Sequence, residues 1–142
     1  MSGYVLDTNL VSETARAKPD ALALDWLSAQ PEGSLFLTAT VIAELASGVE
    51  RMPHGRRREL VAGWLQDAVL NRFGDRILPF DLEAALEYGA LIARARAAGR
   101  PATIADTQIA AVASVHGLGV ATRDVADYAG FGVPLVNPWQ GA

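Results

Sequence analysis

An aspartate follows directly on the first apolar run of the chain, because Tyr4–Leu6 ends at Asp7. A short apolar run of this kind is typical of a buried strand, which would carry the carboxylate at its end. A buried carboxylate is costly unless it is neutralised, paired or bound to a metal. Asp7 is therefore a candidate metal ligand. The alternative is an N-cap for a helix that begins at Thr8.

A second candidate acid, Glu44, lies in the segment TATVIAELASGVE. Its neighbours Val41 and Leu45 are apolar rather than charged, which indicates a site away from bulk solvent. Gly48 follows one turn later on the same face of the expected helix, where the missing side chain leaves room for a ligand. The alternative is an ordinary first-turn glutamate that the helix dipole favours.

A third candidate, Asp106, begins a helical face that is otherwise apolar. Asp106, Ile109, Ala110 and Ala113 have the spacing of one face of a helix, so the carboxylate stands at the top of the stripe that packs on the sheet. The segment TIAD also fits a capping box in which Thr103 is the N-cap.

Two further aspartates lie in the segment ATRDVADYAG, after another apolar run. Asp124 follows that run with Thr122 and Arg123 between, and Asp127 is three residues further on. Either residue could instead be a turn-forming aspartate on the surface.

The elements that would position these acids alternate along the chain. Strands are expected over residues 3–6, 34–39, 76–80, 118–122 and 133–136, and helices over 8–15, 20–29, 41–52, 55–73, 81–99 and 103–116. Apolar strands separated by helices predict an α/β fold with a parallel sheet covered on both faces. Pro134 lacks a backbone donor, which places the last strand at an edge.

In such a sheet, ligands gather beyond the carboxyl ends of the strands. The sequence therefore predicts that the four acids meet at one edge of the sheet. Like charges held close together resist joint ionisation, and a divalent cation removes the conflict. Oxygen ligands suit Mg²⁺ or Mn²⁺, whereas zinc is disfavoured because the chain has no Cys and only two His.

Four segments, in order, resemble the acidic motifs of the PIN domain: YVLDTNLVSE, TVIAELASGVERM, IADTQIAAVA and GVATRDVADY. The resemblance spans residues 4–138 and is strongest to the VapC-type toxin ribonucleases of prokaryotic toxin–antitoxin pairs, including the FitB-like branch. It implies a three-layer α/β/α sandwich with a mainly parallel sheet, and Mg²⁺-dependent cleavage of RNA. It also implies a homodimer and a cognate antitoxin that folds over the active site.

The resemblance also assigns roles to residues of this chain. The catalytic and metal-binding acids would be Asp7, Glu44, Asp106 and Asp124, with Asn9 and Thr122 in support. Many relatives have Thr-Arg-Asn where this chain has Thr-Arg-Asp, which leaves open how the role is divided between Asp124 and Asp127.

We expect Asp7, Asp106 and Asp124 to hold one or two Mg²⁺ ions, and Glu44 to ligate the second ion or to orient the attacking water. Water as the nucleophile predicts products with 5′-phosphate and 3′-hydroxyl ends. Asn9 is expected to hydrogen-bond the backbone at the sheet edge or Asp7.

The net charge of −4 is unusual for a protein that binds nucleic acid. Positive charge is nevertheless gathered in two arginine-rich segments, around 51–58 and around 94–100. These arginines are candidates for contacts with RNA phosphates, and the alternative is a solvated or ion-paired surface role.

Other phosphate chemistries fit the sequence less well. Phosphatases of the haloacid-dehalogenase type and receiver domains need a lysine at a strand end, whereas Lys18 is the only lysine and precedes Pro19 in an early loop. A metal-free mechanism that uses His54 and His116 is disfavoured, since nothing in the sequence places the two side chains near one substrate.

A non-catalytic PIN-like domain that binds RNA or protein remains the alternative function.

Length and composition predict one domain over residues 1–142. The chain shows neither the basic start and apolar run of a signal peptide nor a run long enough to span a bilayer. The sequence therefore predicts a cytoplasmic protein without a membrane partner.

Overall fold

A five-stranded parallel sheet forms the centre of the computed structural model, which describes residues 3–140. The order of the strands is β3-β2-β1-β4-β5. Their bounds are β1 (Tyr4–Leu6), β2 (Leu35–Thr38), β3 (Ile77–Leu78), β4 (Gly119–Ala121) and β5 (Leu135–Val136). The predicted parallel sheet is confirmed, with β1 at its centre and β5 at an edge next to Pro134. Residues 1, 2, 141 and 142 of the predicted domain lie outside the described residues.

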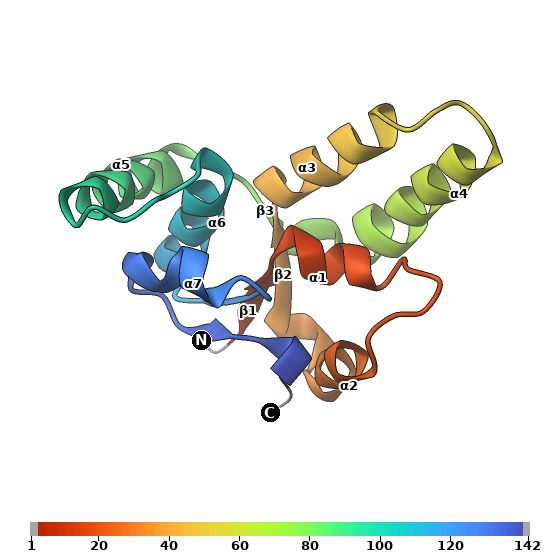
Figure 1. Cartoon of the computed structure of the whole chain (residues 1–142), viewed down its shortest axis with the longest axis horizontal. Coiled ribbons are helices and arrows are strands. Elements are labelled where there is room, and N and C mark those ends of the chain that lie inside the picture. Colours follow the sequence, from red (N-terminus) through yellow and green to blue (C-terminus); the bar gives the residue numbers. More distant parts are fainter. Residues whose placement is uncertain (1–2, 141–142) are drawn as a thin grey trace.

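Helices cover both faces of this sheet, which confirms the three-layer α/β/α architecture. In Figure 1, α5, α6 and α7 lie on one side of the strands, whereas α1, α2 and α4 lie on the other. The helices are α1 (Thr8–Glu13), α2 (Ala21–Ala29), α3 (Ala39–Glu50), α4 (Arg56–Trp64), α5 (Leu82–Ala97), α6 (Ile104–Val115) and α7 (Val125–Tyr128). Short 3₁₀ turns occupy Glu32–Ser34, Gly74–Arg76, Ala129–Phe131 and Pro138–Gln140.

The helix expected over 55–73 is divided into two parts. It is α-helical over α4 and continues as a π-helix, η2 (Leu65–Asn71). A window of seven residues is too short for apolar spacing to distinguish the two windings. The strands are also shorter than expected. Ala39 already belongs to α3, Ser34 and Arg76 belong to 3₁₀ turns, and most of the other expected end residues lie in irregular segments.

Side-chain caps explain where several helices begin. Thr38 accepts a hydrogen bond from the backbone N–H of Val41 at the start of α3, and Thr103 accepts one from Asp106 at the start of α6. Asp20 and Asp81 cap α2 and α5 in the same way. Such caps satisfy backbone donors that a helix leaves free, and they fix the position at which each helix leaves the sheet.

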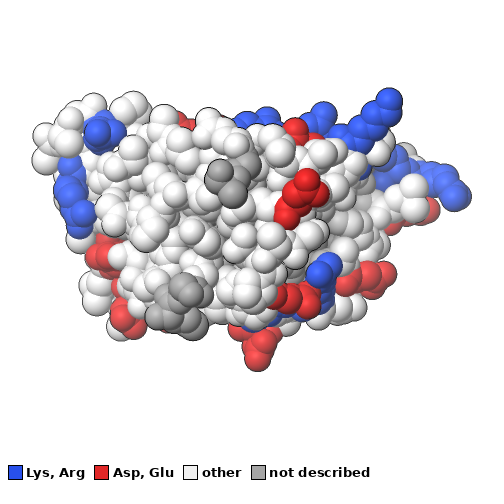
Figure 2. Space-filling view, turned by 90° about the horizontal axis from the view of Figure 1, so that it is seen from below, with Lys and Arg blue, Asp and Glu red and all other residues white. Residues whose placement is uncertain are grey.

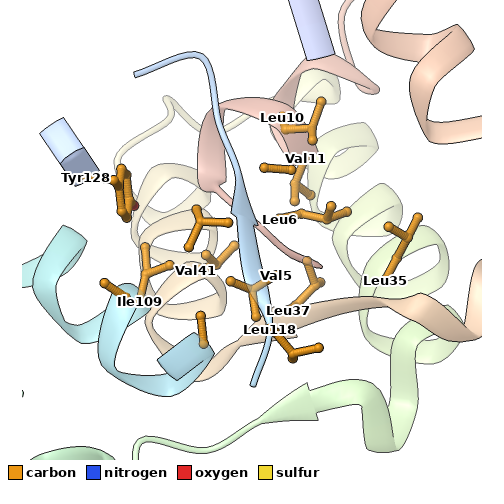
Figure 3. Close-up of a cluster of buried hydrophobic side chains, with 14 of the residues drawn as sticks. Val5, Leu6, Leu10, Val11, Leu35, Leu37, Val41, Ile109, Leu118 and Tyr128 are labelled. Atoms are coloured by element: carbon orange, nitrogen blue, oxygen red, sulfur yellow. The ribbon is translucent and has the colours of Figure 1, made fainter. Parts of the chain in front are cut away.

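The core lies on both sides of β1, as the close-up in Figure 3 shows. Val5, Leu37, Ile109 and Val120 are fully buried. The residues of α6 between Ile109 and Ala113 are mostly alanine, so this helix can pack closely on the strands. The close packing fixes the N-terminal turn of α6, and hence Asp106, relative to the end of β1.

Charged side chains gather mainly at the margins of the face seen in Figure 2, and much of its centre is uncharged. This face lies opposite the carboxyl ends of the strands, so it does not include the predicted acidic site. Within residues 3–140, no helix combines the length and the apolar character needed to cross a bilayer.

Candidate active site

Asp7 lies at the carboxyl end of β1 and is 6% exposed. Its Oδ1 accepts a hydrogen bond from the backbone N–H of Thr8 at 2.8 Å, and its Oδ2 accepts one from Thr122 Oγ1 at 2.7 Å. Burial raises the pKa of Asp7 above its usual value, these hydrogen bonds lower it in part, and the charge of Asp106 raises it further. Asp7 therefore caps α1 and is also a buried carboxylate at the expected edge of the sheet.

The end of β4 joins Asp7 to the fourth acidic segment. Thr122 Oγ1, which donates to Asp7, also accepts a hydrogen bond from the backbone N–H of Asp124 at 2.9 Å. Asn9 Nδ2 donates to Asp124 Oδ2 at 2.9 Å. The prediction that Asn9 bonds the backbone or Asp7 was wrong, because its amide turns towards Asp124 instead.

Asp106 lies in the first turn of α6, where its side chain faces two other acids. Burial raises the pKa of Asp106, hydrogen bonds from Thr103 and Tyr128 lower it in part, and the charges of Asp127 and Glu44 raise it further. Tyr128 donates a hydrogen bond from its hydroxyl to Asp106 Oδ1 at 3.2 Å. Asp127 therefore acts electrostatically on Asp106, whereas Asp124 is held by Asn9.

Glu44 is exposed on α3, so the prediction that it lies away from solvent was wrong. Its apolar neighbours Val41 and Leu45 are buried, but Glu44 itself lines a shallow open pocket of about 460 Å³. Thr8 donates a hydrogen bond to Glu44 from its hydroxyl, which ties α3 to the first turn of α1. Glu44 thus faces the same edge of the sheet, from the solvent side.

Shared polar residues therefore link the four predicted acids. Thr122 contacts both Asp7 and Asp124, Thr8 contacts both Asp7 and Glu44, and Tyr128 lies beside both Asp7 and Asp106. The acids are nevertheless spread around the edge of the sheet. Across residues 3–140, no three acidic or histidine side chains lie close enough to hold a metal ion between them.

The donor atoms at this edge still have the chemistry of a site for a hard cation. All are oxygens, and no arginine or lysine pairs with Asp7, Asp106 or Asp124 in the described part of the chain. Asn9 Oδ1 is buried there without a hydrogen-bond partner. An unpartnered buried oxygen beside mutually repelling carboxylates is an arrangement that a divalent cation would stabilise.

Sequence reasoning missed Tyr128. This residue ends the segment GVATRDVADY, and nothing in the spacing of that segment indicates that its hydroxyl reaches the acids. The structure shows that its ring is fully buried and that its hydroxyl reaches the acidic residues.

Comparison with known proteins agrees with this geometry. A model of the PIN domain matches residues 4–126. The chain belongs to the PIN domain family. The VapC ribonuclease Y4jK of Sinorhizobium fredii is 43% identical, over 97% of this chain and 99% of that protein. Toxin FitB of Neisseria gonorrhoeae is 36% identical, over 96% of this chain and 98% of that protein.

A solved structure supports the same assignment of this PIN domain. The crystal structure of FitAcB from Neisseria gonorrhoeae matches with a TM-score of 0.91 and 35% identity, covering 98% of this chain and 99% of that chain. The predicted resemblance to the FitB-like branch of the VapC-type proteins is therefore confirmed over nearly the whole length.

Proposed function

We propose that this PIN domain is the toxin of a toxin–antitoxin pair and a Mg²⁺-dependent ribonuclease. The observation that carries the proposal is the buried carboxylate of Asp7, which lies beside Asp106 at the carboxyl end of β1 in a PIN domain. The curated relatives include a VapC ribonuclease and a toxin, and both match along nearly all of the chain.

The proposed ligands of the ion are carboxylate oxygens of Asp7, Asp106 and Asp124, with Glu44 on the solvent side. When bound, Mg²⁺ would stabilise negative charge on the scissile phosphate and promote ionisation of the attacking water, and Mn²⁺ could replace it. Thr122 and Thr8 orient Asp7, and Asn9 orients Asp124. Glu44 is exposed and is held by Thr8, so it could ligate a second ion or orient the attacking water.

The test is cleavage of a single-stranded RNA by the purified protein with Mg²⁺ and with EDTA. We expect cleavage only with the metal, and products with 5′-phosphate and 3′-hydroxyl ends. The variants Asp7→Asn and Asp106→Asn should lose activity, whereas the exposed Asp75→Asn should keep it. Cleavage in EDTA with 2′,3′-cyclic phosphate ends would contradict the mechanism. Tight binding of RNA without cleavage would favour the non-catalytic alternative.

The antitoxin is proposed to dock on a groove on the opposite side of the sheet from α5 and α6. The groove has a volume of about 560 Å³ and lies between α1, α2 and the η2 segment. Its walls are mainly apolar, and they include Leu10, Leu24, Leu27 and Trp64. An apolar groove bounded by helices suits an amphipathic helix of a partner protein.

A matched pair of substitutions on α2 tests this groove. Leu24 lines it, whereas Leu22 lies on the same helix, is 49% exposed and is outside the groove. We expect Leu24→Glu to weaken co-purification with the antitoxin encoded beside this gene, and Leu22→Glu to leave it unchanged. Equal binding by both variants would place the antitoxin elsewhere.

The predicted homodimer is proposed to form through α5. Leu82 and Leu86 on this helix are 76% and 70% exposed, and Ala90 and Ala93 continue the same exposed face. Glu83 lies near the start of α5, and Arg94 and Arg96 lie in its last turn. Antiparallel pairing with a second copy of α5 would bring Glu83 of each copy near the arginines of the other. Such a surface is self-complementary, as a two-fold interface requires. Sedimentation velocity should show dimers for the wild type, monomers for Leu86→Glu and dimers for Leu60→Glu, which alters an exposed leucine of α4.

We propose that the protein acts in the cytoplasm. A ribonuclease acts where RNA is present, and the sequence has no Cys that could form a disulfide in an oxidising compartment.

A further inference from the structure

Tyr128 is a fully buried residue whose hydroxyl lies among the acids of the site. Its ring is 0% exposed and packs edge-on against Phe131, with the ring centroids 6.0 Å apart. Figure 3 shows the ring at the margin of the hydrophobic cluster, on the side of Ile109. The packing itself needs only an aromatic ring, and phenylalanine would supply it. The hydroxyl is a polar atom that must have a partner in this environment.

The partner of that hydroxyl is Asp106. Tyr128 donates to Oδ1 of Asp106 at 3.2 Å, and its hydroxyl also interacts with Asp7. The phenol is the donor in this contact, because a carboxylate oxygen can only accept a hydrogen bond.

The Tyr128 hydroxyl lies beside two carboxylates, those of Asp7 and Asp106, whose like charges repel each other. Asp7 directly follows β1, Asp106 lies in the first turn of α6, and Tyr128 lies beside both carboxylates. The two carboxylates come from separate elements, so without a shared contact each could turn away from the other. A donor fixed by core packing limits the rotation of the Asp106 carboxylate and bonds one of its two oxygens, Oδ1.

We propose that Tyr128 is a positioning residue, whose hydroxyl holds Asp106 beside Asp7 so that both carboxylates can bind one divalent cation. This inference rests on the proposed function, in which these acids hold Mg²⁺. The hydroxyl takes no part in the cleavage itself. Its effect is to arrange the acids before the ion arrives, which lowers the free energy cost of ordering them on binding.

The experiment is calorimetric titration of Mg²⁺ or Mn²⁺ into the purified protein, without RNA. Tyr128→Phe keeps the ring and removes only the hydroxyl. We expect this variant to bind the ion about 10-fold more weakly or worse, since loss of a residue that orients a ligand costs about 10–100-fold in affinity. The matched control is Tyr88→Phe on α5, whose ring packs on Phe80. Its affinity should equal that of the wild type.

A second measurement separates positioning from a general loss of structure. With increasing Mg²⁺, cleavage of RNA by Tyr128→Phe should reach half its maximum at a higher metal concentration, with a similar kcat at saturation. Replacement of Tyr128 by 4-aminophenylalanine restores an N–H donor at the same place and should recover metal affinity. This result would hold even if the Phe variant is less stable.

The outcomes distinguish this inference from the proposed function. Unchanged metal affinity in Tyr128→Phe, with a wild type that binds the ion, would overturn the positioning role alone. Weaker binding in Tyr128→Phe, with no cleavage of RNA by the wild type, would support the positioning role and overturn the ribonuclease. A wild type that binds no divalent cation would overturn both.

Discussion

Thr122 donates a hydrogen bond from its hydroxyl to Asp7 Oδ2 at 2.7 Å, although the two residues lie 115 positions apart in the chain. The contact forms because β1 and β4 are adjacent parallel strands, in which Leu6 is paired with Ala121. The residue after each strand therefore reaches the same edge of the sheet. The same hydroxyl accepts a hydrogen bond from the backbone N–H of Asp124, so one side chain links the first and last acidic segments.

The first prediction concerns this link. Thr122→Val has nearly the same shape but leaves a buried carboxylate oxygen and a backbone N–H without their partner. Loss of a hydrogen bond that leaves buried groups unsatisfied costs about 1–3 kcal/mol, so the free energy of unfolding in urea should fall by that amount. Thr122→Ser keeps the hydroxyl and should lose less. Equal losses in the two variants would show that the methyl group, rather than the hydrogen bond, is what matters.

The second prediction concerns Asp7 and the stability of the metal-free protein. Burial raises the pKa of Asp7 above 3.8, so its ionisation at neutral pH opposes folding. The stability that the protonated acid contributes is present below pH 3.8 and is lost as the pH rises through the folded-state pKa. Asp7→Asn should therefore raise the Tm at pH 7 in EDTA by a few degrees, while it abolishes activity.

Thermal melts at several pH values test the cause of this effect. The gain in Asp7→Asn should shrink as the pH falls through the folded-state pKa of Asp7, which lies above 3.8, and should be absent below pH 3.8. Asp75→Asn, which alters an exposed aspartate, should show no such pattern. A lower Tm for Asp7→Asn at pH 7 would mean that the carboxylate stabilises the metal-free fold.

The third prediction is that Mg²⁺ stabilises the wild type. A ligand that binds only the folded state adds about 2.7 kcal/mol when its free concentration is about 100 times Kd. The Tm should therefore rise with Mg²⁺ until the site is saturated. Asp7→Asn and Asp106→Asn should show little or no rise. An equal rise in all three proteins would indicate an ion bound elsewhere.

The fourth prediction concerns Glu13, a buried acid outside the site. Its side chain is 2% exposed and accepts a hydrogen bond from the backbone N–H of Asp20 at 2.9 Å. Arg16 and Arg123 approach the same carboxylate. The Asp20 hydrogen bond is the main reason why the pKa of Glu13 lies below 4.5, and the two arginines lower it further.

A lowered pKa gives the opposite pH dependence to that of Asp7. The stability that Glu13 contributes is present above pH 4.5 and is lost as the pH falls through the folded-state pKa. Glu13→Gln should lower the Tm at pH 7, and the difference from the wild type should narrow in acid. Glu59→Gln, at an exposed site, should change neither value. A difference that stays constant with pH would point to packing rather than charge.

The sequence predicted the sheet, the order of the acidic segments and the N-cap at Thr103, because these depend on spacing along the chain. Asp7 and Asp106 could be found because each carboxylate interrupts an apolar pattern. Contacts between distant elements could not be predicted in the same way. The hydroxyl of Tyr128 among the acids, the bond from Asn9 to Asp124 and the effect of Asp127 on Asp106 depend on how α1, α6 and α7 meet. The exposure of Glu44 was predicted wrongly, because apolar neighbours in the chain do not show which face of a helix is covered.

The most direct test of the account is a crystal structure of the wild type soaked in Mn²⁺, with anomalous diffraction used to locate the ion. We predict a peak at the carboxyl end of β1, with carboxylate oxygens of both Asp7 and Asp106 among its ligands. A map without such a peak, in crystals where the Asp7 carboxylate still bonds only Thr122 and Thr8, would contradict the account.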